Sequence, residues 1–180
     1  SKLNFNGYGN KYNHQNDRLF FNNFIKKNPM NSKELFGEII MEGGNIINST
    51  RDYIFNKNPI AAHNSFSWSE VKKEIKLLFS KSMHGDCYFI DIKPLTGDDT
   101  NGHIDNLVRF KDDKHILYMS TDDKNHPDYE KLKKLENQLA ILITQTNDIS
   151  FMTPINHTCN DLVRNKSGSI LPFSYLNFIR

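Results

Sequence analysis

Two short segments of this chain carry the same pattern and so limit the folds that it can adopt. Residues 44–48 and 102–106 both read Gly-x-Ile-x-Asn and lie 58 residues apart, and an apolar stretch at 39–41 precedes the first copy. A pattern that recurs at a fixed offset is typical of one structural unit used more than once. At this offset the 180 residues correspond to about three units. Chance similarity between short stretches rich in Gly, Ile and Asn is the alternative interpretation.

The second copy contains a histidine and a carboxylate two residues apart. Residues 100–106 read Thr-Asn-Gly-His-Ile-Asp-Asn, with His103 before Asp105. If this segment is extended, His103 and Asp105 share one face and Ile104 packs on the other. A proton-transfer group beside a fixed negative charge suits a cationic substrate that exchanges protons while it reacts. A His-x-Asp triplet by itself is more often a surface or structural pair, so it gains weight only from the repeated segment.

Five segments, in order along the chain, resemble one enzyme family. The two most informative are a Glu-Gly-Gly strand end at 42–44 and the Gly-His-Ile-Asp-Asn segment at 102–106. All five are similar to segments of the agmatine deiminase family, which is close to the bacterial type of peptidylarginine deiminase. The matching segments are Phe5–Tyr12, Met41–Ile46, Gly102–Asn106, Thr121–Glu130 and Leu171–Phe178.

The resemblance implies an α/β fold, the pentein-type five-bladed α/β propeller, of which this chain would supply about three blades. Residues 1–180 would form a partial guanidine-deiminase domain that lacks the N- and C-terminal blades. Two family elements have no counterpart here, namely an upstream Arg-Asp element and a nucleophilic cysteine in a Gly-Gly-Asn-Ile-His-Cys element. We therefore expect the central portion of an enzyme, inactive by itself.

The resemblance also implies a reaction, the hydrolysis of a guanidine C–N bond. Agmatine and water would give N-carbamoylputrescine and ammonia, a step of putrescine and polyamine biosynthesis, through a thiouronium intermediate on the missing cysteine. His103 would be the general acid and base, Asp105 would bind the guanidinium, and Glu42 would hydrogen-bond His103 and fix its tautomer. No metal or other cofactor is implied. The alternatives are a peptidylarginine deiminase and a non-catalytic relative that binds guanidinium ligands.

The remaining candidate residues are interpreted as structural or surface residues. Cys87 reads as a buried strand residue, and Cys159 as a loop residue with no neighbour that would lower its pKa. The acidic pairs at 98–99 and 122–123 read as surface turns. The other six histidines have no carboxylate at strand spacing and read as surface or core residues; they are His14, His63, His84, His115, His126 and His157.

Composition limits the partners that the chain can have. A net charge of +2 is too small to indicate nucleic acid or an anionic membrane. No apolar run approaches the ~18 residues that span a bilayer, and no signal peptide is visible. Two isolated cysteines fit a reducing compartment, so we expect a cytoplasmic protein. The expected partners are a small guanidine substrate, the remaining parts of the same protein and, as an open alternative, a second copy in a homodimer.

Periodicity predicts the main helices and strands. A capping box at Ser67–Glu70 begins a helix that buries Val71, Ile75, Leu78 and Phe79. The predicted strands are 37–48, 86–92 and a hairpin of 107–110 with 115–120, and a further strand is expected to begin within 140–144. The other predicted helices are 17–26 and 127–140, and 154–166 is predicted to be a loop.

Overall fold

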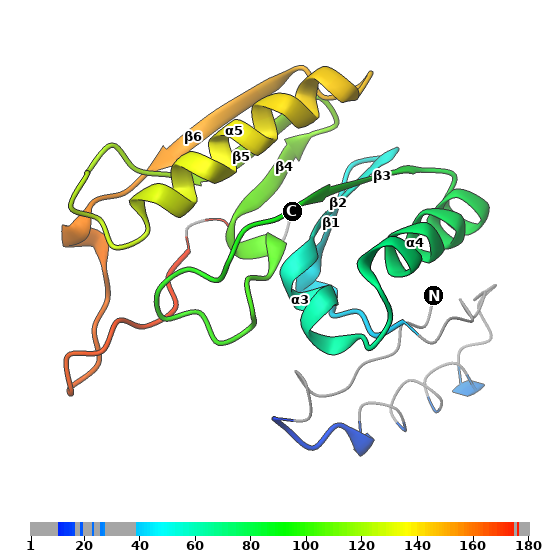
Figure 1. Cartoon of the computed structure of the whole chain (residues 1–180), viewed down its shortest axis with the longest axis horizontal. Helices are drawn as coiled ribbons and strands as arrows, with labels where there is room; N and C mark the ends of the chain where they lie inside the picture. Colours follow the sequence, from blue (N-terminus) through cyan, green and yellow to red (C-terminus); the bar gives the residue numbers. More distant parts are fainter. Residues whose placement is uncertain are drawn as a thin grey trace.

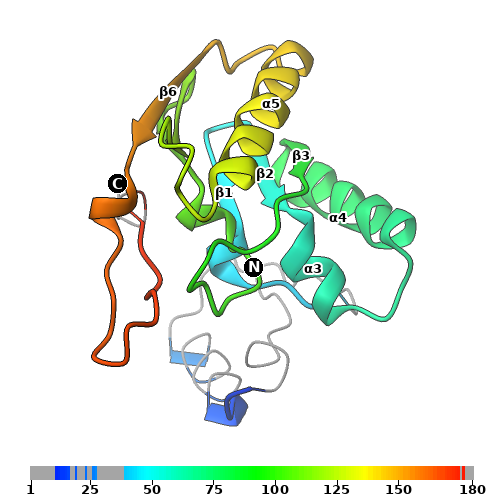
Figure 2. The same ribbon diagram turned by 60° about the vertical axis from the view of Figure 1, so that its left-hand side comes forward.

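The computed structural model describes residues 11–16, 19, 23, 26, 27, 39–174 and 176. Most of the helix predicted over 17–26, most of the aromatic-glycine segment at 5–12 and the end of the segment 171–178 lie outside these residues. The described residues form two mixed sheets, each with a long helix against it (Figures 1 and 2).

The first unit is a three-stranded sheet covered by helix α4 (Figure 1). It comprises the 3-10 helix η1 (Gly43–Asn45), β1 (Ile46–Asn48), β2 (Asp52–Asn56), α3 (Lys57–His63), α4 (Trp68–Met83) and β3 (Asp86–Ile90). The central strand β2 is antiparallel to β1 and parallel to β3. The predicted capping box is present at the start of α4, where Ser67 Oγ accepts from the Glu70 amide and Glu70 Oε2 accepts from the Ser67 amide at 3.0 Å.

The second unit repeats this arrangement. It comprises η2 (Ile104–Asn106), β4 (Val108–Asp112), β5 (His115–Ser120), α5 (Tyr129–Gln145) and β6 (Phe151–Asn156), followed by η3 (Cys159–Asp161). Its central strand β5 is again antiparallel to the strand before it and parallel to the strand after the helix. The described residues therefore contain two copies of one unit, while a third copy and a closed ring of five stay predictions.

The repeat is real, but its register differs from the one that the sequence predicted. Glu42 and His103 are the N-cap residues of η1 and η2, and they are 61 positions apart rather than 58. In each unit the amide three residues after the N-cap donates to the N-cap carbonyl, at 2.9 Å in the first and 3.3 Å in the second. The Gly/Ile/Asn matches were thus offset by three residues from the structural correspondence, and Glu42, not Gly44, opens the first copy.

The first sheet is buried on both faces, which explains the apolar run in β2. Tyr53 and Phe55 pack with α4, while Ile54 between them packs towards the second unit. β3 shows the predicted alternation, because Tyr88 and Ile90 lie on the Ile54 side and Cys87 lies on the α4 side. The two units are therefore packed face to face through one shared core, to which Leu132, Leu135 and Leu139 of α5 contribute.

Several predicted boundaries were wrong for identifiable reasons. Residues 43–45 form η1 rather than continuing a strand, and two of its three residues are glycines. Helix α5 runs to Gln145, so no strand begins within 140–144; Leu142 extends the buried stripe by one more turn. Residues 154–156 belong to β6 rather than a loop, where Pro154 takes a strand position opposite Tyr118.

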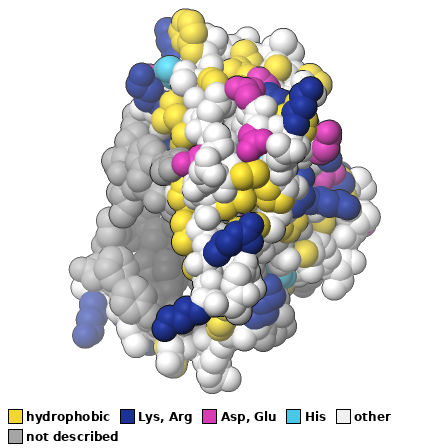
Figure 3. Space-filling view, turned by 90° about the vertical axis from the view of Figure 1, so that its left-hand side faces the viewer, with side chains coloured by type: hydrophobic (Ala, Val, Ile, Leu, Met, Phe, Trp, Pro, Cys, Tyr) yellow, Lys and Arg dark blue, Asp and Glu magenta, His cyan; other side chains and the backbone are white. Residues whose placement is uncertain are grey.

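Charges of both signs are interspersed on the face shown in Figure 3. In the part of the chain that the structure describes, no helix combines the length and the apolar character needed to cross a bilayer.

Asp52, at the start of β2, provides a stability prediction. It is 3% exposed, and burial, with Asp148 and Asp86 nearby, raises its pKa from 3.8 to about 6. A carboxyl group with a raised pKa holds its proton more tightly in the folded state, so stability is lost as the pH rises from 3.8 to about 6. We expect Asp52→Asn to raise the free energy of unfolding at pH 7 by about 1–2 kcal/mol, after allowance for screening.

The measurement is urea unfolding at pH 7 and at pH 4, with Asp99→Asn as a control on an exposed carboxylate. The gain should disappear at pH 4, where the Asp52 carboxyl is protonated in the folded chain. An equal gain at both pH values would show that its charge is not the cause.

Candidate active site

The candidate site lies at the carboxyl end of the parallel pair β2 and β3, and two buried asparagines build it. Asn56, the last residue of β2, donates from Nδ2 to the carbonyl oxygens of Ile92 and Gly102, at 2.7 Å each. Its Oδ1 accepts from the Ile92 amide at 3.0 Å. Asn45 donates to the Asn56 carbonyl at 2.8 Å and accepts from the Asn56 amide at 3.2 Å. These bonds fix η1 and the loop before His103 to the same strand end.

The loop that carries His103 is a tight structure rather than a strand. Gly102 has φ +91°, and a Cβ at this position would lie 3.0 Å from Asn56 Nδ2, so both the backbone and the space require glycine. The His103 amide donates to Thr100 Oγ1 at 3.1 Å, and Asp98 Oδ1 accepts from the amide and the hydroxyl of Thr100 at 2.6 Å each. Asp98 is thus a turn residue that stiffens this loop, as the acidic-turn interpretation predicted.

Glu42 and His103 meet at the centre of the site. His103 Nε2 lies 2.5 Å from Glu42 Oε2, and the two side chains are only 6% and 2% exposed. A carboxylate can only accept, so Nε2 carries the hydrogen and Nδ1 carries the lone pair of the ring. The Glu42 contact therefore selects the tautomer in which Nδ1 can act as a base.

His103 Nδ1 and Asp105 lie together beside Gly44. A Cβ placed on Gly44 would lie 2.4 Å from His103 Nδ1 and 3.0 Å from Asp105 Oδ2. The expected extended segment was wrong, since residues 104–106 form η2, and it is this turn that brings Asp105 back towards His103. The structure therefore brings together Glu42, His103 and Asp105.

Asp105 is a half-buried carboxylate whose environment suits a cation. Burial raises its pKa, while His103 and Arg109 act in the opposite direction. Its Oδ1 is shielded from solvent and has no hydrogen-bond partner among the described residues. A shielded carboxylate oxygen is costly unless a partner reaches it, and a bound cation would supply that partner.

Sequence reasoning missed one member of this cluster, His63. Its Nε2 lies 3.4 Å from Glu42 Oε1, and its side chain is 6% exposed. His63 is the last residue of α3, 21 positions after Glu42, and no local spacing links the two. No sequence signal marks it: the neighbouring Asn64 fixes this end of α3 by bonding both backbone groups of Ile40, at 2.9 and 3.0 Å, and only the structure shows these bonds.

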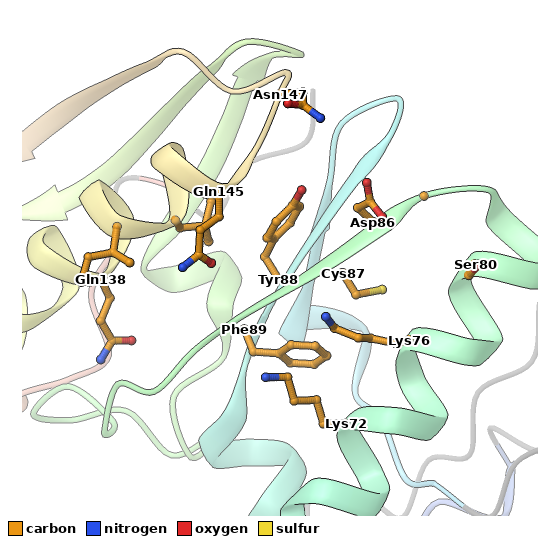
Figure 4. Close-up of a pocket in the computed structure, with 13 residues that line it drawn as sticks. Lys72, Lys76, Ser80, Asp86, Cys87, Tyr88, Phe89, Gln138, Gln145 and Asn147 are labelled. Atoms are coloured by element: carbon orange, nitrogen blue, oxygen red, sulfur yellow. The ribbon is translucent and has the colours of Figure 1, made fainter.

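Neither cysteine of the chain is activated. Burial raises the pKa of Cys87 to about 12, and the side chain points towards α4 in a cavity of about 600 Å³ between β3, α4 and α5 (Figure 4). A hydrogen bond to Asp123 raises the pKa of Cys159. Both environments favour the thiol over the thiolate, which is the nucleophilic form.

The strand ends of the second unit carry a pair of buried histidines. His126 and His157 are 4% and 3% exposed, with ring centroids 4.6 Å apart. His126 Nδ1 accepts from the Asp128 amide at 3.1 Å. Burial lowers the pKa of both rings, and His126 lowers the pKa of His157 further, whereas Asp128, Asp123 and Asp161 act oppositely on His126. Both rings therefore resist protonation in the folded chain more than an exposed histidine does.

This pair predicts a loss of stability in acid. The unfolded chain takes up protons on these rings below the ordinary histidine pKa of 6.5, whereas the folded chain resists them. We expect the free energy of unfolding to keep its full value above pH 6.5. It should fall by about 1 kcal/mol as the pH is lowered to 5. Thermal unfolding from pH 5 to pH 8 would measure it. His157→Phe should flatten the profile, and an unchanged profile in that variant would contradict this account.

The fold is shared with solved structures of agmatine deiminases. The chain superposes on a C. jejuni agmatine deiminase solved with substrate bound, with a TM-score of 0.78 over 99% of this chain and 51% of that chain, at 21% identity. On the Enterococcus faecalis agmatine deiminase the TM-score is 0.62, over 86% of this chain and 44% of that chain, at 13% identity. At such identities these likenesses show the fold.

The family follows from sequence. The family model for Porphyromonas-type peptidyl-arginine deiminase matches residues 1–180, and the chain belongs to this family. An agmatine deiminase of Medicago truncatula is 29% identical over 103 residues, which are 53% of this chain and 24% of that protein. The resemblance stated from sequence is thus confirmed. The chain spans about half the length of these solved relatives and about a quarter of the curated one.

Proposed function

We propose that the protein carrying this chain hydrolyses the guanidinium group of agmatine to N-carbamoylputrescine and ammonia. The observation that carries the proposal is the convergence of three groups at one strand end: the buried Glu42–His103 pair, with Asp105 beside the opposite side of the imidazole. The family membership supports a guanidine-modifying hydrolase. The complete domain would be a five-bladed propeller to which this chain contributes the central blades.

Each group has one task in this reaction. Asp105 pairs with the guanidinium and holds its central carbon near His103. The thiol of a cysteine from another part of the protein gives its proton to His103 Nδ1 and attacks that carbon as the thiolate. His103 then passes this proton to the departing ammonia, leaving a thiouronium adduct. Water then attacks the adduct, His103 takes its proton, and the carbon–sulfur bond breaks to release the carbamoyl product and the thiolate. Glu42 keeps Nδ1 as the atom that exchanges protons.

A second candidate substrate is the arginine side chain of a peptide. The description of the family that the chain matches favours it. Both substrates present the same guanidinium, so Glu42, His103 and Asp105 would act in the same way on each. A relative that binds guanidinium ligands without turnover stays the third reading, and the 180-residue chain alone, with Cys87 and Cys159 both held as thiols, is expected to be inactive.

Ammonia release by the complete protein separates these readings. Release from agmatine but not from a blocked arginine peptide supports the proposal, and the reverse supports the peptide substrate. Binding of agmatine by calorimetry without any release would point to the binding protein. No binding and no release with either compound would refute the whole group of functions.

Replacing Asp105 should mainly weaken capture of the cation. We expect Asp105→Asn to lower kcat/KM by on the order of 10²-fold, because the amide keeps the shape but not the charge. Only the ionised form of Asp105 pairs with the cation, and burial raises the pKa of this carboxyl group. In the unaltered protein, kcat/KM should therefore decline as the pH is lowered, and the decline should begin at a higher pH than for an ordinary aspartate. Steady-state kinetics from pH 5 to pH 8 measure both. An Asp105→Asn enzyme of near-normal efficiency would remove this residue from the site.

A further inference from the structure

We propose that His63 is a positioning residue, which acts on His103 through the second oxygen of the Glu42 carboxylate. This inference rests on the proposed function of the site and adds a residue to it. His63 Nε2 lies 3.4 Å from Glu42 Oε1, while His103 Nε2 lies 2.5 Å from Glu42 Oε2. Two imidazoles therefore flank one carboxylate, one at each oxygen.

The Glu42 carboxylate needs a second donor. Its side chain is 2% exposed, and Oε1 makes no hydrogen bond within the described residues. A buried carboxylate oxygen without a donor is costly, and the group can relieve that cost by carrying a proton itself. A protonated carboxyl would donate to His103 Nε2, and the ring would then carry its own hydrogen on Nδ1. The atom beside Asp105 would become a donor and could not act as a base.

Hydrogen bonds near both ends of α3 fix the position of His63. Asn64, the C-cap of α3, accepts from the Ile40 amide at 2.9 Å and donates to the Ile40 carbonyl at 3.0 Å. Ile40 lies two residues before Glu42, so these two bonds fix the end of α3 against the segment that carries the carboxylate. At the other end of the same helix, Asn58 donates to the Ile92 carbonyl at 2.7 Å.

His63 also contacts the loop that carries His103. Asn101 Nδ2 lies 3.2 Å from His63 Nε2, and Asn101 has φ +64° two residues before His103. A single ring nitrogen either donates or accepts, so Nε2 serves the Glu42 carboxylate or the Asn101 amide, but not both at once. A small shift of the ring from the amide towards Oε1 would complete the hydrogen bond to Glu42.

The test follows the tautomer of His103 by two-dimensional ¹H–¹⁵N NMR of the imidazole rings in the 180-residue chain at neutral pH. The unaltered chain should show His103 protonated at Nε2. His63→Leu should lose this preference, with signals of the Nδ1-protonated form appearing. His63→Gln, whose amide can still donate to Oε1, should retain it, whereas the shorter amide of His63→Asn should not. His115→Leu is the matched control, because His115 bonds Thr153 on the second sheet.

The proposal is overturned if His103 keeps its tautomer in both His63→Leu and His63→Asn while the backbone spectrum shows a folded chain. If His63→Leu does not fold, the comparison of the Gln and Asn variants decides alone. This measurement needs neither agmatine nor a nucleophile. A protein that fails to hydrolyse guanidines could still show the tautomer change, so failure of this inference and failure of the proposed function are separate results.

Discussion

Replacing His103 with alanine is expected to lower turnover of agmatine by the complete protein at least ~10³-fold, because one imidazole serves both proton transfers. The structure supplies the reason that no neighbour can replace it. His103 is held by the Glu42 carboxylate at 2.5 Å, and its Nδ1 lies beside Asp105, which is an acceptor when ionised. His63 is near, but its Nε2 faces the opposite oxygen of Glu42.

Ammonia release at saturating agmatine measures this effect. His115→Ala is the control, since that ring is bonded to Thr153 Oγ1 at 2.7 Å in the second sheet and should have no kinetic effect. A His103→Ala enzyme with near-normal turnover would show that the proton transfers occur elsewhere.

Replacing Asn56 with leucine is expected to lower the free energy of unfolding by about 3–5 kcal/mol. Asn56 is 0% exposed, and its amide satisfies both backbone groups of Ile92 and the carbonyl of Gly102. Leucine is similar in size but leaves the Ile92 amide and the Gly102 carbonyl without this partner, and each buried group costs about 1–3 kcal/mol. The Ile92 carbonyl keeps its hydrogen bond from Asn58 at 2.7 Å. Because Gly102 directly precedes His103, the same change should release the loop that carries the imidazole.

Urea unfolding gives the loss, and agmatine binding by calorimetry gives the effect on the site. Asn48→Ala is the matched control, because Asn48 is exposed and its side chain bonds only the neighbouring Ser49 carbonyl in the described structure. That control should lie within about 0.5 kcal/mol of the unaltered chain. A loss of similar size in both variants would mean that the Asn56 amide has no special part in fixing the strand end.

The sequence predicted helices and strands correctly where a short residue pattern by itself determines the local structure. Ser67 and Glu70 mark the start of α4 through their own hydrogen bonds, and the alternation of Tyr88 and Ile90 with Cys87 follows from a strand buried on both faces. The predicted ends of helices and strands were wrong where tertiary packing determines them. Helix α5 continues past the predicted end because Leu142 still packs in the core.

The site was predicted in part, for a related reason. Glu42, His103 and Asp105 stand in motifs that resemble a family, so the residues could be named before the structure was known. Their geometry could not, because η2 turns Asp105 back beside Gly44 where an extended strand was expected. His63 was missed altogether, since its contact with Glu42 depends on how Asn64 fixes α3 to Ile40, which no periodicity records.

The most direct test of the account is to locate the guanidinium of bound agmatine in a crystal structure of the complete protein. The guanidinium should pair with the Asp105 carboxylate, with its central carbon on the side of the His103 ring that faces Gly44. Agmatine bound away from Asp105 and His103, in crystals grown where calorimetry shows the site to be saturated, would contradict it.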